Sequence, residues 1–386
     1  MKKYILLFCA CLVLSFGIKK LYDAHKYKND LYVFADFGAG PGLLEMVDFI
    51  KAPTQVRKLV AWAPWHGLKH RANLDDFNAR EIDFNARTGE EYYYHIMNKL
   101  AEELASEVKA NPDLQITLYT NTDYIGNTLA NLRRVISDGN IKHIHLYESG
   151  FGQTVAWRKN EILKHTFLKG PPKRPEHPAA PYYTHEIFPT TYYIGYYDTI
   201  RKNHDFKNFK KLMDNAKVKN VNYKKIAKSL GYFDRKKLAL LLDIDINAYK
   251  KAYKTSPKKT AFLIGPKPLG VRETEAQIFI LGELMEANDY KWFFKPHPHP
   301  SSRIITDRLK KRFPDLEIIP PQIPIEAFLF LDILPDYVGG YSSSVFFTLD
   351  KSLFLFYIKR PHDTYLPFLL EQGILQRSQT RKLPSP

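Results

Sequence analysis

Two stretches in the second half of the chain combine the side chains that bind phosphate. Lys295 and His297 follow a buried-strand pattern, in the order Lys295-Pro-His297-Pro. A glycine pair and three hydroxyl residues follow another strand pattern, in Gly339-Gly-Tyr-Ser-Ser343-Ser344. An anionic phosphate needs a point charge, a proton donor, and hydroxyl and backbone N–H donors at close range. We therefore predict one phosphate site from both stretches, with His297 as its general acid.

Two more residues are assigned to this site. Glu326 starts a short apolar helix between the two stretches, where a carboxylate can accept hydrogen bonds from a ribose or complement the helix dipole. Gly265 lies near the end of the expected strand 261–266. We predict no metal and no cofactor. His297 and His299 lack a third ligand, and Asp243-Ile-Asp245, which resembles a metal-binding Asp-x-Asp, lies between helical periods and not after a strand.

Two acids in the first half of the chain are candidates for a catalytic base. Glu148 ends one predicted strand, and Asp123 follows the strand before it. A carboxylate that faces the phosphate site across a cleft can take the proton of an acceptor hydroxyl. A surface acid is the alternative explanation for each, and the sequence does not choose between them.

Strand and helix patterns alternate through both halves at the spacing of α/β folds. We expect strands at 31–36, 56–63, 114–121 and 141–148, with helices at 43–51, 91–111 and 127–136. A second set of strands is expected at 261–266, 291–295, 316–319, 336–339 and 352–358. This α/β pattern predicts two Rossmann-like domains facing a central cleft, a GT-B-like architecture.

Five prolines between residues 169 and 181 indicate a domain boundary or a mobile loop, because such a stretch suits neither a helix interior nor a central strand. The expected division is an N-terminal acceptor domain, 30–180, and a C-terminal donor domain, 181–362. Residues 198–256 read as helices. A C-terminal helix within 363–386 is expected to pack back on the first domain.

Residues 1–20 form a separate segment. Two lysines precede a mostly apolar run, Tyr4 to Ile18, and two more follow it. This is typical of a signal peptide or a membrane anchor. We expect association with a bacterial inner membrane or export to the periplasm, and the flanking lysines leave the side open. Both cysteines, Cys9 and Cys11, lie in this run, so no disulfide framework is expected in the fold.

The chain of 386 residues has a net charge of +16, densest in 201–260. Nucleic acid, an anionic membrane surface or an anionic small substrate can each explain such a charge. No nucleic-acid motif accompanies the basic residues, so nucleic acid is not an expected partner. Solvated helix faces are the simplest explanation.

The phosphate-site stretches resemble those of bacterial GT-B sialyltransferases, glycosyltransferase family 80. Lys295-Pro296-His297-Pro is similar to the Lys-Gly-His-Pro of that family, with Pro296 in place of glycine. Leu334-Pro-Asp-Tyr-Val-Gly-Gly-Tyr-Ser-Ser-Ser344 is similar to its Leu-Pro-Asp-x-Val-Gly-Gly/Ala-x-x-Ser-Ser. Weaker similarity runs over roughly 31–360.

The family transfers sialic acid from CMP-sialic acid to a sugar hydroxyl, with inversion and without a metal. The resemblance implies that His297 is the general acid or phosphate partner and that Ser343 and Ser344 bind the CMP phosphate. Lys295 would complete the donor site together with Glu326, which falls at the position of the ribose-binding Glu in that family.

The departures from the family lie on the acceptor side. The family base is the second acid of an Asp-Asp-Gly, where this chain has Glu148-Ser149-Gly150, and a serine is no base near neutral pH. The acceptor-side His of the family falls at Tyr124, and its acceptor-stacking Trp at about Leu269. Either Glu148 or Asp123 is then the base, or the usual transfer is weak or lost.

We therefore expect a sialyltransferase-like enzyme that uses CMP-sialic acid and a galactoside-terminated glycan or glycolipid, in the synthesis of a surface glycan such as lipooligosaccharide. Three alternatives stay open. They are a transferase for another CMP-linked acidic sugar, a non-catalytic protein that binds nucleotide sugars, and a basic protein that binds nucleic acid or a membrane surface.

Overall fold

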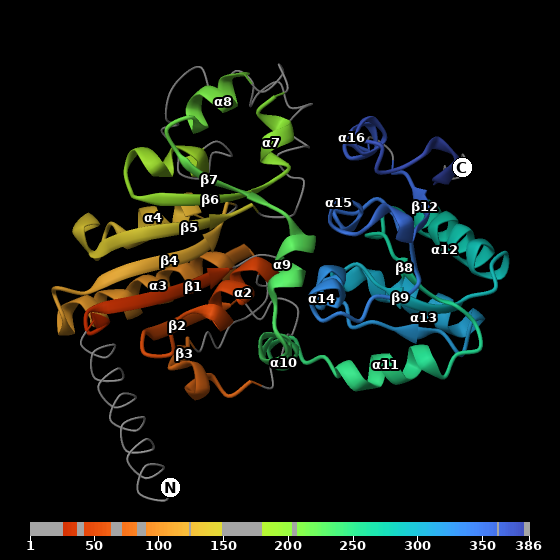
Figure 1. Cartoon of the computed structure of the whole chain (residues 1–386), viewed down its shortest axis with the longest axis horizontal. Helices are drawn as coiled ribbons and strands as arrows, with labels where there is room; N and C mark the ends of the chain where they lie inside the picture. Colours follow the sequence, from red (N-terminus) through yellow and green to blue (C-terminus); the bar gives the residue numbers. More distant parts are fainter. Residues whose placement is uncertain are drawn as a thin grey trace, which may run out of the picture.

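The computed structural model describes residues 26–36, 42–62, 72–82, 90–122, 125–148, 180–202, 207–360 and 363–381. The fold consists of two parallel sheets that lie beside each other, the first on the left and the second on the right in Figure 1. This arrangement confirms the predicted α/β class with two Rossmann-like domains.

The first sheet has seven strands in the order β3-β2-β1-β4-β5-β6-β7, all paired in parallel. The strands are β1 (Asp30–Asp36), β2 (Arg57–Trp62), β3 (Ala79–Glu81), β4 (Gln115–Asn121), β5 (Ile141–Tyr147), β6 (Thr190–Gly195) and β7 (Lys217–Val221). Central strands are apolar on both faces because helices cover both faces. In β1, for example, only Tyr32 is not fully buried.

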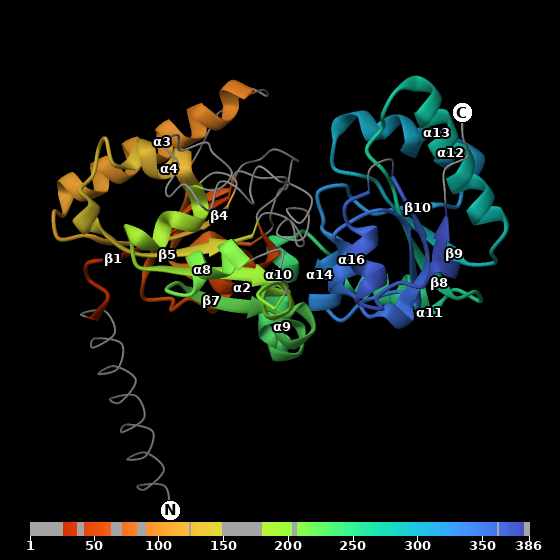
Figure 2. The same cartoon turned by 90° about the horizontal axis from the view of Figure 1, so that it is seen from above.

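The helices of the first domain lie on both faces of its sheet. Figure 2 shows α3 and α4 on one side and α2 on the other. The helical segments are α2 (Leu43–Lys51), α3 (Glu90–Ala110), α4 (Ile125–Leu132), α7 (Tyr197–Ile200), α8 (Lys207–Met213), and the 3₁₀ turns η1 (Leu74–Phe77), η2 (Asp138–Asn140) and η4 (Ala180–Glu186). In α3, the buried residues Ile96, Leu100 and Leu104 recur every four residues, as on one face of an amphipathic helix.

The second sheet has six parallel strands in the order β10-β9-β8-β11-β12-β13. They are β8 (Thr260–Ile264), β9 (Lys291–Lys295), β10 (Glu317–Ile318), β11 (Tyr337–Tyr341), β12 (Phe354–Ile358) and β13 (Thr380–Arg381). The helical segments are α11 (Ile246–Lys254), α12 (Val271–Glu286), η6 (Pro300–Ser302), α13 (Arg303–Arg312), α14 (Ile325–Phe330), α15 (Val345–Thr348), η7 (Lys351–Leu353), α16 (Leu366–Glu371) and η8 (Arg377–Gln379).

The sheet topology corrects the domain boundary expected at residues 180/181. Strands β6 and β7 continue the first sheet, so the first domain extends to Val221. The helices α9 (Tyr223–Ser229) and α10 (Tyr232–Leu241) then lead to the second domain, and α9 lies between the two sheets in Figure 1. The expectation that 198–256 is helical fails at β7. Of the proline-rich stretch, residues 169–179 lie outside the described ranges.

The C-terminal segment returns to the first domain and then leaves it again. Phe368 of α16 packs edge-on against Tyr196 of the first domain, with ring centroids 5.5 Å apart, as the expected C-terminal helix should. However, β13 then pairs with β12 in the second sheet. Residues 363–381 therefore contact both domains, whereas the whole segment 363–386 was expected to join the first domain.

No helix within the described ranges is long and apolar enough to cross a membrane. The segment 1–20, expected to be a signal peptide or anchor, falls outside those ranges.

Candidate functional site

A cavity of about 410 Å³ is lined by residues of both domains, many of which follow the C-terminal ends of strands. In open α/β sheets, ligands bind at this end, where the strand order reverses. In the second sheet the reversal lies between β8 and β11, and residues that follow both strands line the cavity. The predicted residues among its lining are Gly265, Lys295, His297, Glu326, Ser343, Ser344 and Glu148.

Lys295 is the last residue of β9 and is buried. Its ammonium donates to the carbonyl of Pro296 at 2.9 Å and to that of Pro321 at 2.8 Å. Burial lowers the pKa of Lys295 to about 8, although the nearby carboxylate of Glu326 opposes this. A cation in this position can supply a fixed charge to a ligand at the strand end.

Glu326 lies in the first turn of α14 and is buried. Burial raises the pKa of its carboxyl, whereas its own backbone N–H, Lys295 and the Thr348 hydroxyl lower it. The carboxylate therefore has hydrogen-bond and charge partners in the domain that holds it. Glu326 lines the same cavity as Lys295, as the sequence predicts.

His297 is held by the loop that follows β9. Its Nδ1 accepts a hydrogen bond from the backbone N–H of His299 at 3.1 Å, which leaves Nε2 to carry the proton of the neutral ring. Burial, followed by the charges of Arg360 and Lys295, lowers the pKa of His297 to about 4. In the free protein the imidazole is thus a neutral donor at pH 7. A bound phosphate, being anionic, would raise this pKa.

The hydroxyl cluster follows a distorted strand end. Gly340 has φ +138°, and a Cβ there would lie 2.4 Å from the Ile264 carbonyl oxygen of β8, so only glycine fits. The register with β12 shifts at this point. The chain then turns, so that Ser342, Ser343 and Ser344 line the cavity. Ser342 accepts from Tyr357 at 2.7 Å, and Ser344 is the N-cap residue of α15.

Gly265 lines the cavity directly after β8, but the neighbouring strand already explains why it is glycine. A Cβ at this position would lie 2.6 Å from the Phe294 ring and 3.2 Å from the Lys295 carbonyl oxygen. The residue therefore lets β8 and β9 end close together, and this keeps Lys295 at the edge of the cavity.

The first domain contributes Glu148 to the same cavity. Glu148 directly follows β5, and its Oε2 accepts from the Gly195 backbone N–H at 3.0 Å. It is the one carboxylate of the first domain that lines the cavity among the described residues. Asp123, Tyr124 and Ser149, the other predicted acceptor-side residues, lie outside the described ranges.

Two of the residues singled out in the sequence lie away from the cavity or have another role. Leu269 is exposed and does not line the cavity. Asp245, from the Asp-x-Asp pattern, is the N-cap of α11 and accepts from the backbone N–H of Asn247 and Ala248. No group of three potential metal ligands occurs within the described part of the chain.

Several lining residues were not singled out from the sequence. Arg360 follows β12, Tyr365 precedes α16, and Gly42 and Tyr223 start α2 and α9. The N–H of Gly42 donates to the buried carboxylate of Asp36 at 2.6 Å. Only Gly42 had a local signal, a glycine-rich turn between a strand and a helix. The others reach the cavity through long-range topology.

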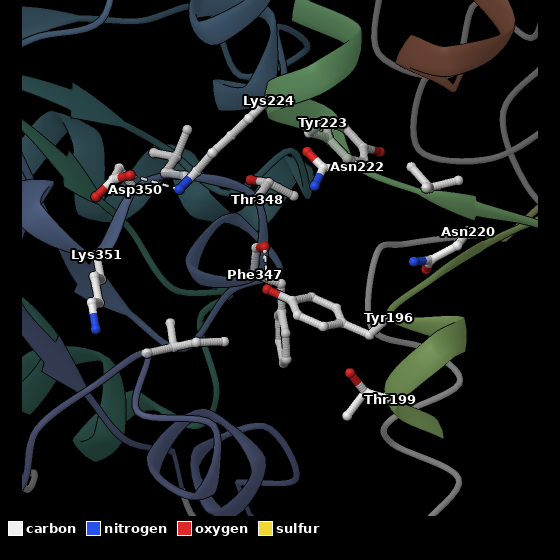
Figure 3. A pocket seen from close by; sticks show the side chains of 13 residues that line it. Tyr196, Thr199, Asn220, Asn222, Tyr223, Lys224, Phe347, Thr348, Asp350 and Lys351 are labelled. Carbon is white, nitrogen blue, oxygen red and sulfur yellow. Dashed lines mark hydrogen bonds and ion pairs between the residues drawn. The ribbon is translucent and has the colours of Figure 1, made fainter. Parts of the chain in front are cut away.

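A second cavity, of about 330 Å³, shares Tyr223 with the first in its lining. Figure 3 shows its lining side chains, which come from both domains. Lys224 pairs with Asp350 at 2.6 Å, and the Tyr196 hydroxyl donates to the Phe347 carbonyl at 2.8 Å. The polar groups here join the two domains to each other. The first cavity has the charged residues that a phosphate requires.

The two facing parallel sheets and the shared cavity define a GT-B fold. Solved structures with this fold resemble the chain closely. The 2,6-sialyltransferase of Photobacterium sp. JT-ISH-224, solved with CMP and lactose, aligns with a TM-score of 0.71 and 18% identity over 92% of this chain and 78% of that chain. An α-2,3-sialyltransferase of Photobacterium phosphoreum aligns with a TM-score of 0.69 and 19% identity over 92% of this chain and 98% of that chain.

A third structure, the GT-B domain of a Photobacterium damselae sialyltransferase, aligns with a TM-score of 0.67 and 21% identity over 92% of this chain and 99% of that chain. No curated protein sequence matches the chain. Residues 274–360 match the family model described as Sialyltransferase PMO188. This match spans Lys295, His297, Glu326, Ser343 and Ser344, the residues on which the predicted resemblance to sialyltransferases rests.

Proposed function

We propose that the protein is a sialyltransferase that moves sialic acid from CMP-sialic acid to the hydroxyl of a galactoside-terminated glycan. The observation that carries the proposal is the gathering of Lys295, His297, Glu326, Ser343 and Ser344 in one cavity, within the segment that matches the sialyltransferase model. Two relatives support the ligand classes, since one was solved with CMP and lactose and another is named a galactoside sialyltransferase.

In the proposed reaction, the acceptor oxygen bonds to the anomeric carbon of sialic acid while the bond from that carbon to the CMP phosphate oxygen breaks. Both electrons of the breaking bond leave with CMP. His297 Nε2, Lys295 and the hydroxyls of Ser343 and Ser344 stabilise the phosphate as its charge grows. Attack opposite the leaving group inverts the anomeric centre, and these protein groups do the work of a metal.

Glu148 is our candidate for the base that takes the acceptor proton, because it reaches the cavity from the first domain. Asp123 remains the second candidate. A glycolipid acceptor, a role in lipooligosaccharide synthesis, and attachment to a membrane through residues 1–20 belong to the same proposal. They are supported by the basic and apolar N-terminal pattern and by the net charge of +16.

The test is CMP release by the purified chain with CMP-sialic acid, measured with and without a soluble galactoside. Release that depends on the galactoside, with sialylated product, supports the proposal. Release only with a different CMP-linked acidic sugar changes the donor. Tight CMP binding without any turnover would indicate a non-catalytic protein that binds nucleotide sugars, an alternative that the serine at position 149 favours.

A further inference from the structure

Two neighbouring aromatic side chains stand in solvent at the corner where α9 meets α10. Tyr232 is 76% exposed and Phe233 is 74% exposed. Their rings pack edge-on against each other, with centroids 5.5 Å apart. Burying large apolar side chains away from water is favourable, and exposed apolar patches rimmed by polar residues can mark interaction sites.

Basic residues surround this pair. Lys236 lies one helical turn beyond both aromatic residues, and Lys228 lies in the last turn of α9, just before the corner. Lys51 of α2 reaches the same place, where its ammonium donates to the Ser229 hydroxyl at 3.2 Å. Neither Lys228 nor Lys236 forms an ion pair with the described residues. The α9–α10 corner, defined as Lys51, Lys228, Tyr232, Phe233 and Lys236, is thus apolar at its tip and cationic around it.

The surrounding segment concentrates the charge of the protein. Residues 201–237 contain thirteen Lys and Arg against three Asp and no Glu. Two acids in or beside α10 have partners of their own: Asp234 accepts from the Gly231 N–H at 3.2 Å, and Asp332 pairs with Arg235 at 3.2 Å. The excess of Lys and Arg over Asp in this segment therefore favours an anionic partner.

The corner lies close to the 410 Å³ cavity that holds the proposed donor site, here called the donor cavity. Tyr223, at the start of α9, and Leu242, just after α10, both line that cavity. Helix α9 has seven residues and α10 has ten, so the corner lies about 10–15 Å from the cavity at the usual helical rise. Figure 2 shows α9 at the outer margin of the molecule.

We propose that the α9–α10 corner docks on an anionic membrane surface, with Tyr232 and Phe233 among the lipid head groups and the lysines against lipid phosphates. Aromatic residues favour this interface, and each nearby lysine strengthens association by about fivefold. The docked corner would hold the donor cavity within reach of a lipid-borne glycan. This last consequence rests on the proposed function, whereas the docking itself does not.

The test follows the corner itself, because residues 1–20 can bind lipid independently. The full chain carries Cys9→Ser and Cys11→Ser, which leave no other cysteine, and Phe233→Cys is labelled with an environment-sensitive fluorophore. Val271→Cys, at a residue 82% exposed in the second domain, is the matched control. Both proteins are mixed with vesicles of phosphatidylcholine alone or with phosphatidylglycerol added.

We expect a blue shift at position 233 with phosphatidylglycerol vesicles only, reversed by high salt and absent at position 271. Lys228→Gln with Lys236→Gln should weaken the partition constant more than tenfold. The proposal would be overturned by no shift at position 233, by an equal shift at position 271, or by an equal shift with vesicles that lack phosphatidylglycerol. A shift that appears without vesicles when the protein concentration is raised would indicate self-association and would also overturn it. Turnover of a soluble galactoside by Tyr232→Ser with Phe233→Ser should stay unchanged, and it tests the proposed function separately.

Discussion

The Tyr196 hydroxyl of the first domain donates a 2.8 Å hydrogen bond to the Phe347 carbonyl of the second. Phe347 belongs to α15, whose N-cap is Ser344 of the proposed phosphate site. Its ring also packs against Tyr365, which lines the donor cavity, with centroids 5.1 Å apart. Tyr196 has φ +53°, a conformation unusual for a residue other than glycine. The first domain thus holds the far end of the segment that carries the hydroxyls.

Tyr196→Phe should raise the Kd for CMP and the KM for the donor by about 2- to 13-fold, the usual worth of one hydrogen bond. The value of kcat should change less, because Tyr196 does not line the donor cavity. The matched control is Lys224→Gln, which breaks the exposed bridge to Asp350 beside the same residues and should change the Kd by less than about twofold. Equal effects of both variants would remove this positioning role.

Ser343→Ala combined with Ser344→Ala should weaken CMP binding by about 10- to 100-fold, because hydrogen bonds to a charged phosphate are stronger than neutral ones. Titration calorimetry with CMP measures this directly, and cytidine is the control ligand. Cytidine lacks the phosphate, so its affinity should be little altered. A double variant that binds CMP like the wild type would place the phosphate elsewhere.

His297→Ala should lower donor turnover by about 10²- to 10⁴-fold, the range for a positioned proton donor. The effect should appear mainly in kcat, because the ring donates most strongly as charge develops on the phosphate. Rapid-quench measurement of CMP formation separates this step from product release. Turnover close to that of the wild type would exclude His297 from the chemistry.

His297 also predicts a pH dependence of stability. Its pKa is lowered from 6.5 to about 4 in the folded protein, so between these values the unfolded chain binds a proton that the folded protein does not. This residue therefore makes the protein less stable as the pH falls from about 6.5 to about 4. Between pH 7 and pH 5, the Tm of the His297→Gln variant should fall less than the Tm of the wild type. Parallel curves would show that the imidazole does not titrate in this way.

Glu148→Gln should reduce transfer to the galactoside by about 10²-fold or more if this carboxylate is the base, with little change in CMP affinity. The amide oxygen can still accept from the Gly195 N–H, so the loop should keep its place. Asp123→Asn is the companion variant. Full transfer by Glu148→Gln together with loss in Asp123→Asn would assign the base to Asp123.

The donor half of the site could be predicted because its signals are local. Lys295 ends a buried strand and His297 follows it, and the glycine pair before Ser343 includes Gly340, whose backbone conformation only glycine fits. In a parallel sheet, residues past adjacent strand ends must meet at one edge. Local sequence pattern and sheet topology therefore both predict that these residues lie together at one edge of the second sheet.

The remaining parts of the fold depend on contacts that the local sequence does not show. Strand β7 reads Lys217-Val-Lys-Asn-Val221 and pairs with β6 alone. As an edge strand it needs few apolar residues, and its polar sequence resembles a helix face. Arg360 and Tyr365 lie in the cavity because β12 ends beside β11. No spacing near either residue indicates this.

The path of the C-terminal segment bears on how such enzymes can be recombined. The backbone enters the second domain through α9 and α10. Helix α16 then contacts the first domain, and β13 pairs in the second sheet. A chimera that exchanges the donor half by a single crossover after β7 would thus pair a foreign Phe368 with the resident Tyr196. A chimera should therefore take the residues at positions 196 and 368 from the same parent. Transfer of the donor half then depends on a contact that lies outside the donor cavity.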